Sequence, residues 1–209
     1  MNLFADLKDK VAVVTGGYGY LGTSMVTSLT KHKCKVYVMG RSLEKFSEKF
    51  SENNSVFFQE VDVANINSIR NGFEAIGKKE SVIDVLINNG GISQRSLVVE
   101  TNIHVDKRIM DINYLGTVAL TKAILPHFIE KKEGQFVVTT SIVGKIGTPL
   151  RSSYAASKHA LHGFFDSLRA ENHQKNISVT LLCPGFINTN ISKNALIGNG
   201  AAQGKMDVS

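Results

Sequence analysis

A tyrosine and a lysine stand four positions apart in the segment Tyr154-Ala155-Ala156-Ser157-Lys158. On an α-helix, residues with this spacing share one face, so the phenol and the ammonium group are expected to be neighbours. An isolated phenol has a pKa of about 10, and about 4 kcal/mol of differential stabilisation by nearby cations would bring it to about 7. The pair is therefore a candidate general acid–base, although most such pairs are surface residues and the spacing alone means little.

A glycine-rich segment near the start of the chain has the spacing of a dinucleotide phosphate loop. Gly17, Gly19 and Gly22 give G-x-G-x-x-G directly after an apolar run and before a predicted helix. Glycine permits a tight turn and close approach of the backbone to a pyrophosphate, and the helix N-terminus attracts phosphate. A glycine-rich turn without a ligand is the alternative. The residues expected to contact the cofactor here are Gly16, Gly17, Tyr18, Gly19, Tyr20, Leu21 and Gly22.

The end of the second predicted strand bears on which dinucleotide would bind. The sequence there is Met39-Gly40-Arg41-Ser42, with no carboxylate before Glu44. An acidic residue would bind the ribose 2′-hydroxyl of NAD, whereas arginine suits the 2′-phosphate of NADP. We therefore expect NADP(H), with NAD(H) as the alternative if Arg41 is only a solvated residue at the start of a helix.

Apolar runs alternate with amphipathic stretches along the chain, which is the pattern of β-α units and a parallel sheet. These runs show little polar–apolar alternation, as expected of strands that are covered on both faces. The predicted strands are residues 10–15, 35–39, 56–61, 82–87, 135–140 and 178–183. Together with five helical segments, they predict one domain over residues 1–209, an α/β fold of the three-layer α/β/α sandwich type with a Rossmann-type doubly wound parallel sheet.

Two long helices are predicted in the second half of the chain. One covers residues 106–125 and lies before Pro126, and the other covers residues 153–172 and carries the tyrosine–lysine pair. Adjacent Phe164 and Phe165 on the latter are expected to face a subunit interface and the core, one each. His159 and His162 are expected to be packing or surface residues. Gln94 and Arg95 follow the fourth strand and are expected either to line the substrate mouth or to be surface residues.

Together these motifs resemble the short-chain dehydrogenase/reductase family, in the family's order and over nearly the whole chain. The residues that carry the resemblance are Thr15-Gly16, Asp62-Val63, Asn88-Asn89-Gly90-Gly91, Asn113, Ser141, Tyr154-Ala155-Ala156-Ser157-Lys158, Pro184-Gly185 and Thr189. The chain is most similar to the single-domain branch of the family, and within it to hydroxysteroid dehydrogenase-like and orphan dehydrogenase/reductase members. Each motif is weak alone, but the combination is specific.

The resemblance implies a catalytic tetrad of Asn113, Ser141, Tyr154 and Lys158. Tyr154 would donate a proton to a carbonyl oxygen in reduction, or accept one in alcohol oxidation. Ser141 would stabilise the charge that develops on that oxygen. Lys158 would lower the Tyr154 pKa and hold the nicotinamide ribose, and Asn113 would fix a water that links Lys158 to solvent. The implied substrate is a small carbonyl compound or alcohol: a hydrophobic ketone or secondary alcohol, with a sugar acid or 3-oxoacyl compound as alternatives.

The resemblance also implies cofactor contacts outside the glycine-rich segment. The residues concerned are Asp62, Val63, Asn89, Gly90, Gly91, Pro184, Gly185, Ile187 and Thr189, together with Tyr154 and Lys158. Asp62 would meet the adenine, and Asn89 and Gly90 would lie on the ribose side of the cofactor. Thr189 would anchor the carboxamide. Without the tetrad, Asp62 would be read as a strand-end cap and residues 88–91 as a turn.

Two features depart from the family pattern. Tyr20 stands where single-domain members usually have the middle glycine of T-G-x-x-x-G-x-G, so the loop reads T-G-x-x-G-x-x-G. After Thr189 the family usually has a substrate-covering loop, another helix and a seventh strand, whereas residues 190–209 are polar and contain no strand-like run. The fold is therefore expected to lack the family's last helix and strand, which leaves the sixth strand as an edge. A catalytically silent dinucleotide-binding protein or an inactive fragment is the alternative to an active enzyme.

Composition narrows the remaining functional classes. The chain has 43% hydrophobic and 20% charged residues, as ordinary globular proteins do. Its two cysteines, Cys34 and Cys183, have no metal-ligand spacing, so no metal site is expected. The net charge of +6 comes from scattered lysines and suits an anionic cofactor, so no nucleic acid is expected as a partner. No stretch approaches the length of a membrane span. We expect no membrane contact, a cytoplasmic location, and a homodimer or homotetramer built on the two long helices.

Overall fold

Six parallel strands form the centre of the molecule. The computed structural model describes residues 7–207, so residues 1–6 of the N-terminal stretch and residues 208–209 lie outside it. The strands are β1 (Val11–Thr15), β2 (Lys35–Gly40), β3 (Val56–Glu60), β4 (Val85–Asn88), β5 (Gly134–Thr139) and β6 (Ile177–Leu182). Their order in the sheet is β3-β2-β1-β4-β5-β6. The order reverses between β1 and β4, which is the topological switch point of a Rossmann fold.

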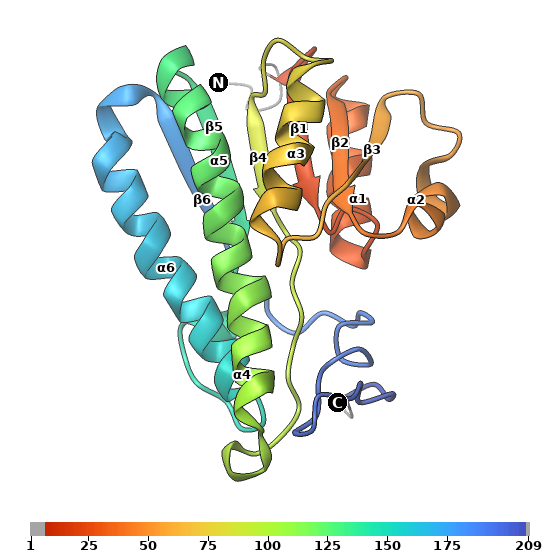
Figure 1. The fold of residues 1–209 in the computed structure, drawn as a ribbon, viewed down its shortest axis with the longest axis vertical. Coiled ribbons are helices and arrows are strands. Elements are labelled where there is room, and N and C mark those ends of the chain that lie inside the picture. Colours follow the sequence, from red (N-terminus) through yellow and green to blue (C-terminus); the bar gives the residue numbers. More distant parts are fainter. Residues whose placement is uncertain (1–6, 208–209) are drawn as a thin grey trace.

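Helices cover both faces of this sheet and give three layers, as predicted (Figure 1). The helices are α1 (Tyr20–Lys31), α2 (Leu43–Phe50), α3 (Ile66–Gly77), α4 (Ile103–Met110), α5 (Gly116–Lys131) and α6 (Ser152–Asn172). Val11 and Val13 of β1 pack in a core with α3, α5 and α6, whereas Ala12 and Val14 pack in a second core with α1 and α2. Because successive strand residues point to opposite faces, each unbroken apolar run supplies both cores.

The helix predicted to lie before Pro126 continues through this residue to Lys131. Pro126 is exposed, so the carbonyl group that proline cannot satisfy lies on the solvent side of the helix. Packing beyond the proline stabilises the additional residues. The ring of Phe128 is fully buried, and its centroid lies 5.0 Å from that of Phe136. Between Pro126 and Phe128, His127 accepts a hydrogen bond of 3.1 Å at its Nε2 from the amide of Ile83.

A five-residue π-helical segment, Asp111–Leu115, joins α4 to α5. The sequence pattern indicated one uninterrupted helix and gave no sign of this segment. A π turn inserts an extra residue into a helix and shifts the side chains around it, and such segments occur frequently at functional sites. Here it carries Asn113, which is turned into the protein interior.

The chain after β6 does not return to the sheet within the residues that the structure describes. β6 pairs with β5 alone and is therefore an edge strand, as expected. The C-terminal segment, residues 183–207, instead folds beside α4 below the sheet (Figure 1). Leu196 makes isolated β-bridges to Gln94 and Ala202 and packs with Val105 and Ile109 of α4.

Candidate active site

The glycine-rich segment makes a tight turn between β1 and α1. Gly16 has a φ of +64°, and a Cβ atom on it would lie 2.9 Å from the Cα of Gly90. A Cβ on Gly17 would lie 2.8 Å from the Val38 side chain, and one on Gly22 would overlap the carbonyl oxygen of Gly16. A side chain at any of these three positions would clash with neighbouring atoms and distort the turn. The packing therefore requires glycine and leaves bare backbone at the switch point, where a pyrophosphate would fit.

Helix α1 begins without a side-chain cap. Its N-cap, Gly19, has no side chain to bond the first amides, and no acidic residue lies in the first turn. These amides and the helix dipole favour a phosphate group. Tyr20, which replaces the family's glycine, is the first residue of the helix and is 67% exposed, so the larger side chain is accommodated in solvent. Leu21, which follows it, is half-buried.

Tyr18 packs across the end of β2 and fixes the backbone at Arg41. A Cβ on Gly40 would lie 2.5 Å from the Tyr18 ring, so this close contact depends on glycine. The amide of Arg41 donates a hydrogen bond of 3.1 Å to the Tyr18 hydroxyl group. The Arg41 side chain is exposed beside the glycine-rich turn. Tyr18 was expected to contact the cofactor, and its support of the Arg41 backbone could not be predicted from the sequence.

Thr15 and Asn89 tie together the carboxyl ends of β1, β4 and β5. Thr15 Oγ1 accepts hydrogen bonds from the amides of Asn89 and Gly90, at 3.1 and 3.0 Å. Asn89 Nδ2 donates to the carbonyl oxygens of Thr15 and Gly16, at 3.4 and 3.3 Å, and its Oδ1 accepts from the Thr139 hydroxyl at 3.1 Å. The hydrogen bonds of the Asn89 side chain are therefore made within the protein, and they hold the ends of β1, β4 and β5 together beside the glycine-rich turn.

Asp62 and Val63 lie after β3. Asp62 Oδ1 accepts a hydrogen bond of 3.0 Å from the amide of Ala64, and the Asp62 amide donates to Ser68 Oγ at 3.0 Å. Asp62 therefore acts as a local cap, which the sequence left open, while its side chain stays half-buried at the edge of the site. The Val63 carbonyl packs against α5, where a Cβ on Gly116 would lie 2.6 Å from the Val63 oxygen.

Asn113 connects the loop after β4 to α6. It is 1% exposed. Its Oδ1 accepts from the amide of Ile92 and its Nδ2 donates to the carbonyl of Ile92, both at 2.9 Å. Its Nδ2 also donates to Ser157 Oγ at 3.1 Å. Asn113 therefore holds the tyrosine helix against the loop, a role that the sequence did not reveal.

Lys158 is buried, and its amine faces the carboxyl end of β5. Its Nζ donates a hydrogen bond of 2.8 Å to the carbonyl oxygen of Thr139 and lies 5.7 Å from the centroid of the Tyr154 ring. A Cβ on Gly91 would lie 3.7 Å from the same Nζ, so Gly91 borders the space around the amine. Burial disfavours the charged amine and lowers the pKa of Lys158 to about 8.

Tyr154 and Ser141 are brought together, as their motif spacing suggested. Burial raises the pKa of Tyr154, while a hydrogen bond with Ser141 and the charges of Arg95 and Arg151 act to lower it. Ser141 also caps the short turn after β5, where its Oγ accepts from the amide of Val143 at 3.2 Å. Burial outweighs these influences, so the Tyr154 pKa is raised in the protein alone and not lowered as expected, and Tyr154 is a protonated phenol at neutral pH.

The loop after β6 lies beside the Ser141 turn. The carbonyl oxygen of Pro184 accepts a hydrogen bond of 3.0 Å from the amide of Ile142, which follows Ser141. Gly185 and Ile187 are exposed, and Thr189 Oγ1 accepts from the amide of Ile191 at 3.3 Å. The loop is thus held against the turn that carries Ser141.

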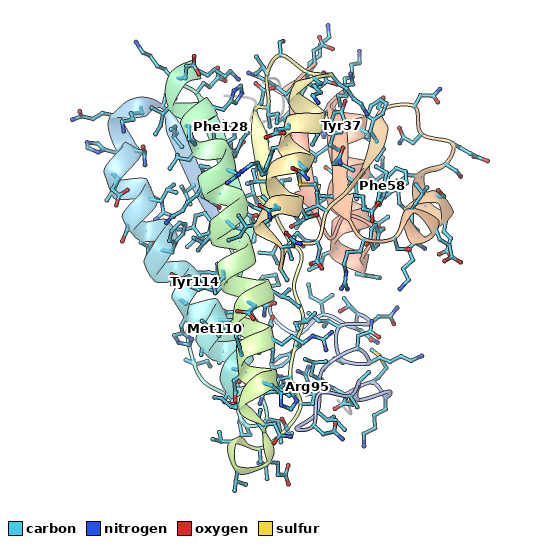
Figure 2. All side chains as sticks on the ribbon, viewed as in Figure 1. Tyr37, Phe58, Arg95, Met110, Tyr114 and Phe128 are labelled. Atoms are coloured by element: carbon cyan, nitrogen blue, oxygen red, sulfur yellow. The ribbon has the colours of Figure 1, made fainter. Side chains whose placement is uncertain are left out.

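Gln94 and Arg95 are interior residues, and the surface alternative for them is wrong. Gln94 is fully buried, and its Oε1 accepts from the amide of Ser153 at 2.9 Å, which positions the start of α6. The Arg95 side chain is 8% exposed. Figure 2 shows Arg95 next to the C-terminal segment. The histidines are packing or surface residues, as expected: His162 is buried, whereas His159 is exposed and its Nδ1 lies 2.9 Å from the carbonyl oxygen of Ala155.

Neither a metal centre nor a membrane span is found in residues 7–207. No group of three or more His, Cys, Asp or Glu side chains in this range could hold a metal ion. No helix in the same range is long and apolar enough to cross a bilayer. The strand order and the glycine turn at its switch point define a Rossmann-type protein, and the tyrosine–serine–lysine group lies at the carboxyl edge of its sheet.

Comparison with known proteins agrees with this class. The family model described as short chain dehydrogenase matches residues 10–198. A dehydrogenase/reductase SDR family protein 7-like of Anopheles gambiae is 43% identical over 96% of this chain and 66% of its own length. Dehydrogenase/reductase SDR family member 7B of Mus musculus is 41% identical over 97% of this chain and 65% of its own length. The chain belongs to the short-chain dehydrogenase family and spans just under two thirds of the length of these relatives.

Solved structures show the same fold. A short-chain dehydrogenase from Streptomyces avermitilis has a TM-score of 0.84 and 26% identity, covering 93% of this chain and 70% of its own. ElxO with NADP bound has a TM-score of 0.83 and 30% identity, covering 87% of this chain and 75% of its own. A dehydrogenase/reductase from Burkholderia phymatum in complex with NAD has a TM-score of 0.85 at 21% identity, covering 90% of this chain and 69% of its own.

Proposed function

We propose that this chain is an NADP(H)-dependent oxidoreductase that interconverts a ketone or aldehyde and an alcohol, with Tyr154 as general acid and base. The observation that carries the proposal is the half-buried phenol of Tyr154, hydrogen-bonded with Ser141 and flanked by the amine of Lys158. Membership in the short-chain dehydrogenase family and the dehydrogenase/reductase relatives support the reaction class.

In the direction of reduction, Tyr154 begins as a protonated phenol and donates its proton to the carbonyl oxygen of the substrate. The Ser141 hydroxyl hydrogen-bonds the same oxygen and stabilises its developing charge. The cationic form of Lys158 makes loss of the phenolic proton easier. The nicotinamide cofactor supplies the hydride when bound. Reversing the proton transfer gives alcohol oxidation.

The preference for NADP(H) rests on Arg41. Its side chain is exposed beside the glycine turn, and Tyr18 holds its backbone in place. A guanidinium group binds a phosphate with strong charge-assisted hydrogen bonds, so Arg41 suits the 2′-phosphate. ElxO, which is 30% identical, has NADP bound, which supports the same choice here.

The test is to replace Tyr154 by Phe in the full chain. Tyr154→Phe keeps the ring and removes the transferable proton, so NADPH-dependent reduction of a ketone panel should fall by at least about 1,000-fold, within the range of general acid catalysis. NADPH binding, measured by nicotinamide fluorescence, should persist. Tyr114→Phe is the matched control, since the Tyr114 ring packs edge-on to Phe164 and should keep that packing. Undiminished turnover by Tyr154→Phe would refute the proposed role.

We further propose that the chain is one domain, cytoplasmic, and a homodimer or homotetramer built on the helices that cover residues 103–131 and 152–172. Cys34 and Cys183 are free thiols, which suits a reducing compartment. Phe165 is fully buried, while Phe164 is half-buried and packs edge-on with Tyr114, near the surface of these helices. Light scattering on the purified chain would test the assembly, and a monomeric mass would contradict it.

A further inference from the structure

Two arginines from distant parts of the chain converge on one carboxylate. Arg95 Nη2 lies 2.6 Å from Asp207 Oδ2, and Arg151 Nη2 lies 3.1 Å from the same oxygen. Arg95 Nε also donates to Asp207 Oδ1 at 2.8 Å, so its pairing with the carboxylate is bidentate. Ser192 Oγ and Gln203 Nε2 donate to the carboxylate as well, at 2.9 and 3.3 Å. This is a complete binding site for an anionic group, occupied by a side chain of the chain itself.

The two arginines lie next to the catalytic phenol. Arg151 is the N-cap of α6, three positions before Tyr154, and Gln94, the neighbour of Arg95, bonds the amide of Ser153 on the same turn. The charges of both arginines act to lower the pKa of Tyr154, against the larger effect of burial. Arg151 also lies 5.8 Å from the ring centroid of Phe186, which is 80% exposed on the loop after β6. The arginine pair therefore borders the space where a substrate carbonyl would meet Tyr154.

The C-terminal segment does not depend on Asp207 to stay in place. The amide of Leu196 donates to the carbonyl of Ser93 and the amide of Arg95 donates to the carbonyl of Leu196, both at 2.8 Å. Ala195 and Leu196 are buried against α4. Asp207 lies eleven residues beyond Leu196, and its side chain is one-third exposed, at 33%. Its contact with the arginines can therefore open while the rest of the segment remains bound.

We propose that Arg95 and Arg151 bind an anionic group of the substrate, and that Asp207 occupies this site as an internal competitor. The inference rests on the proposed oxidoreductase function and narrows its substrate class to carbonyl compounds that carry a carboxylate or a phosphate. Guanidinium groups bind both anions with bidentate, charge-assisted hydrogen bonds. Displacement of Asp207 by the substrate anion would place the substrate carbonyl near Tyr154 while the two arginines remain paired.

The first test compares 4-acetylbenzoate with its neutral methyl ester as substrates for the full chain with NADPH. The wild type should reduce the acid with at least about 10-fold higher kcat/KM, the effect of one good charge-assisted contact. Asp207→Asn should lower the KM for the acid several-fold, because the competitor is weakened, and Arg151→Gln should abolish the preference. Arg169→Gln is the matched control, because Arg169 lies on the same helix, is 44% exposed and pairs with Asp166. It should retain the preference.

The second test needs no turnover. The melting temperature of Asp207→Asn should rise with added benzoate or inorganic phosphate, and the same anions should have little effect on Arg151→Gln. A larger rise with benzoate would indicate a carboxylate substrate, and a larger rise with phosphate a phosphorylated one. Reduction of acid and ester at equal rates would overturn the inference but keep the proposed function. If no ketone is reduced, the function fails, and the anion titration still decides the site: no rise in Asp207→Asn would overturn it.

Discussion

The buried amine of Lys158 donates a hydrogen bond of 2.8 Å to the carbonyl oxygen of Thr139, the last residue of β5. This bond ties α6 to the edge of the sheet at which the glycine turn also lies. It holds the amine 5.7 Å from the centroid of the Tyr154 ring. Since the Thr139 hydroxyl bonds Asn89 at 3.1 Å, one residue links the lysine to the cofactor side of the site.

Burial of Lys158 should make the free energy of unfolding depend on pH in the alkaline range. The pKa of Lys158 is about 8 in the folded chain against an ordinary value of 10.5. Between these values the unfolded chain binds more protons, so stability rises with pH; below pH 8 both states are protonated and the penalty of burying the charge is fully present. The difference in unfolding free energy between wild type and Lys158→Met should therefore shift in favour of the wild type by about 2 kcal/mol from pH 8 to 10.

Urea denaturation of the cofactor-free proteins at several pH values measures this shift. Methionine has a similar length and no charge, and the other lysines are common to both proteins, so their titration cancels in the difference. A difference that stays constant across this pH range would mean that Lys158 titrates as an exposed lysine does.

Two glycine substitutions should have opposite effects. A Cβ on Gly22 would overlap the carbonyl oxygen of Gly16, whereas a Cβ on Gly163 would meet no atom within 4 Å. Gly22→Ala should destabilise the fold by more than about 1 kcal/mol and weaken NADPH binding. Gly163→Ala, in the exposed middle of α6, should stabilise it by about 0.5–1 kcal/mol because alanine is the better helix former. Urea denaturation and NADPH titration of both variants would check this, and equal stability of the two would contradict the predicted packing of the turn.

Arg41 should determine the choice between the two nicotinamide cofactors. Arg41→Ala should weaken NADPH binding by about 10- to 100-fold, which corresponds to the loss of a charge-assisted hydrogen bond, and should leave NADH binding nearly unchanged. Arg70→Ala, at an exposed position on α3, is the control for a general change in charge. Nicotinamide fluorescence titrations give all the constants. Equal affinity of the wild type for NADH and NADPH would mean that Arg41 does not select the 2′-phosphate; membership in the short-chain dehydrogenase family would be unaffected.

The strands could be predicted from the sequence because their apolar runs are buried on both faces. The main error is at β4, which was predicted to start at residue 82 and begins at Val85. Asp84 explains the difference. Its backbone still pairs with Val11 and Gln135, but its buried carboxylate accepts a hydrogen bond of 2.8 Å from the amide of Val11. The amide of Ile83, one residue earlier, donates to His127 Nε2 at 3.1 Å, so side chains take up hydrogen bonds just before the strand begins.

The identities of the tetrad residues could be predicted from their motifs, but their supporting contacts could not. The two bonds of Asn113 to Ile92 depend on a π turn that has no hydrophobic period of its own. The pairing of Arg95 with Asp207 spans 112 positions. Its partner lies in a polar stretch that looked unstructured, because the period of apolar residues says nothing about charged contacts between distant loops.

Transfer of deuterium from C4-deuterated NADPH to a ketone, followed by mass spectrometry of the alcohol, tests the central claim most directly. Both C4 stereoisomers of the labelled cofactor and a panel of acidic, aromatic and aliphatic ketones would be used. Deuterium is expected on the former carbonyl carbon with the wild type, and none with Tyr154→Phe although that variant binds NADPH. Tight NADPH binding by the wild type without deuterium in any product would contradict the account and point to a catalytically silent dinucleotide-binding protein.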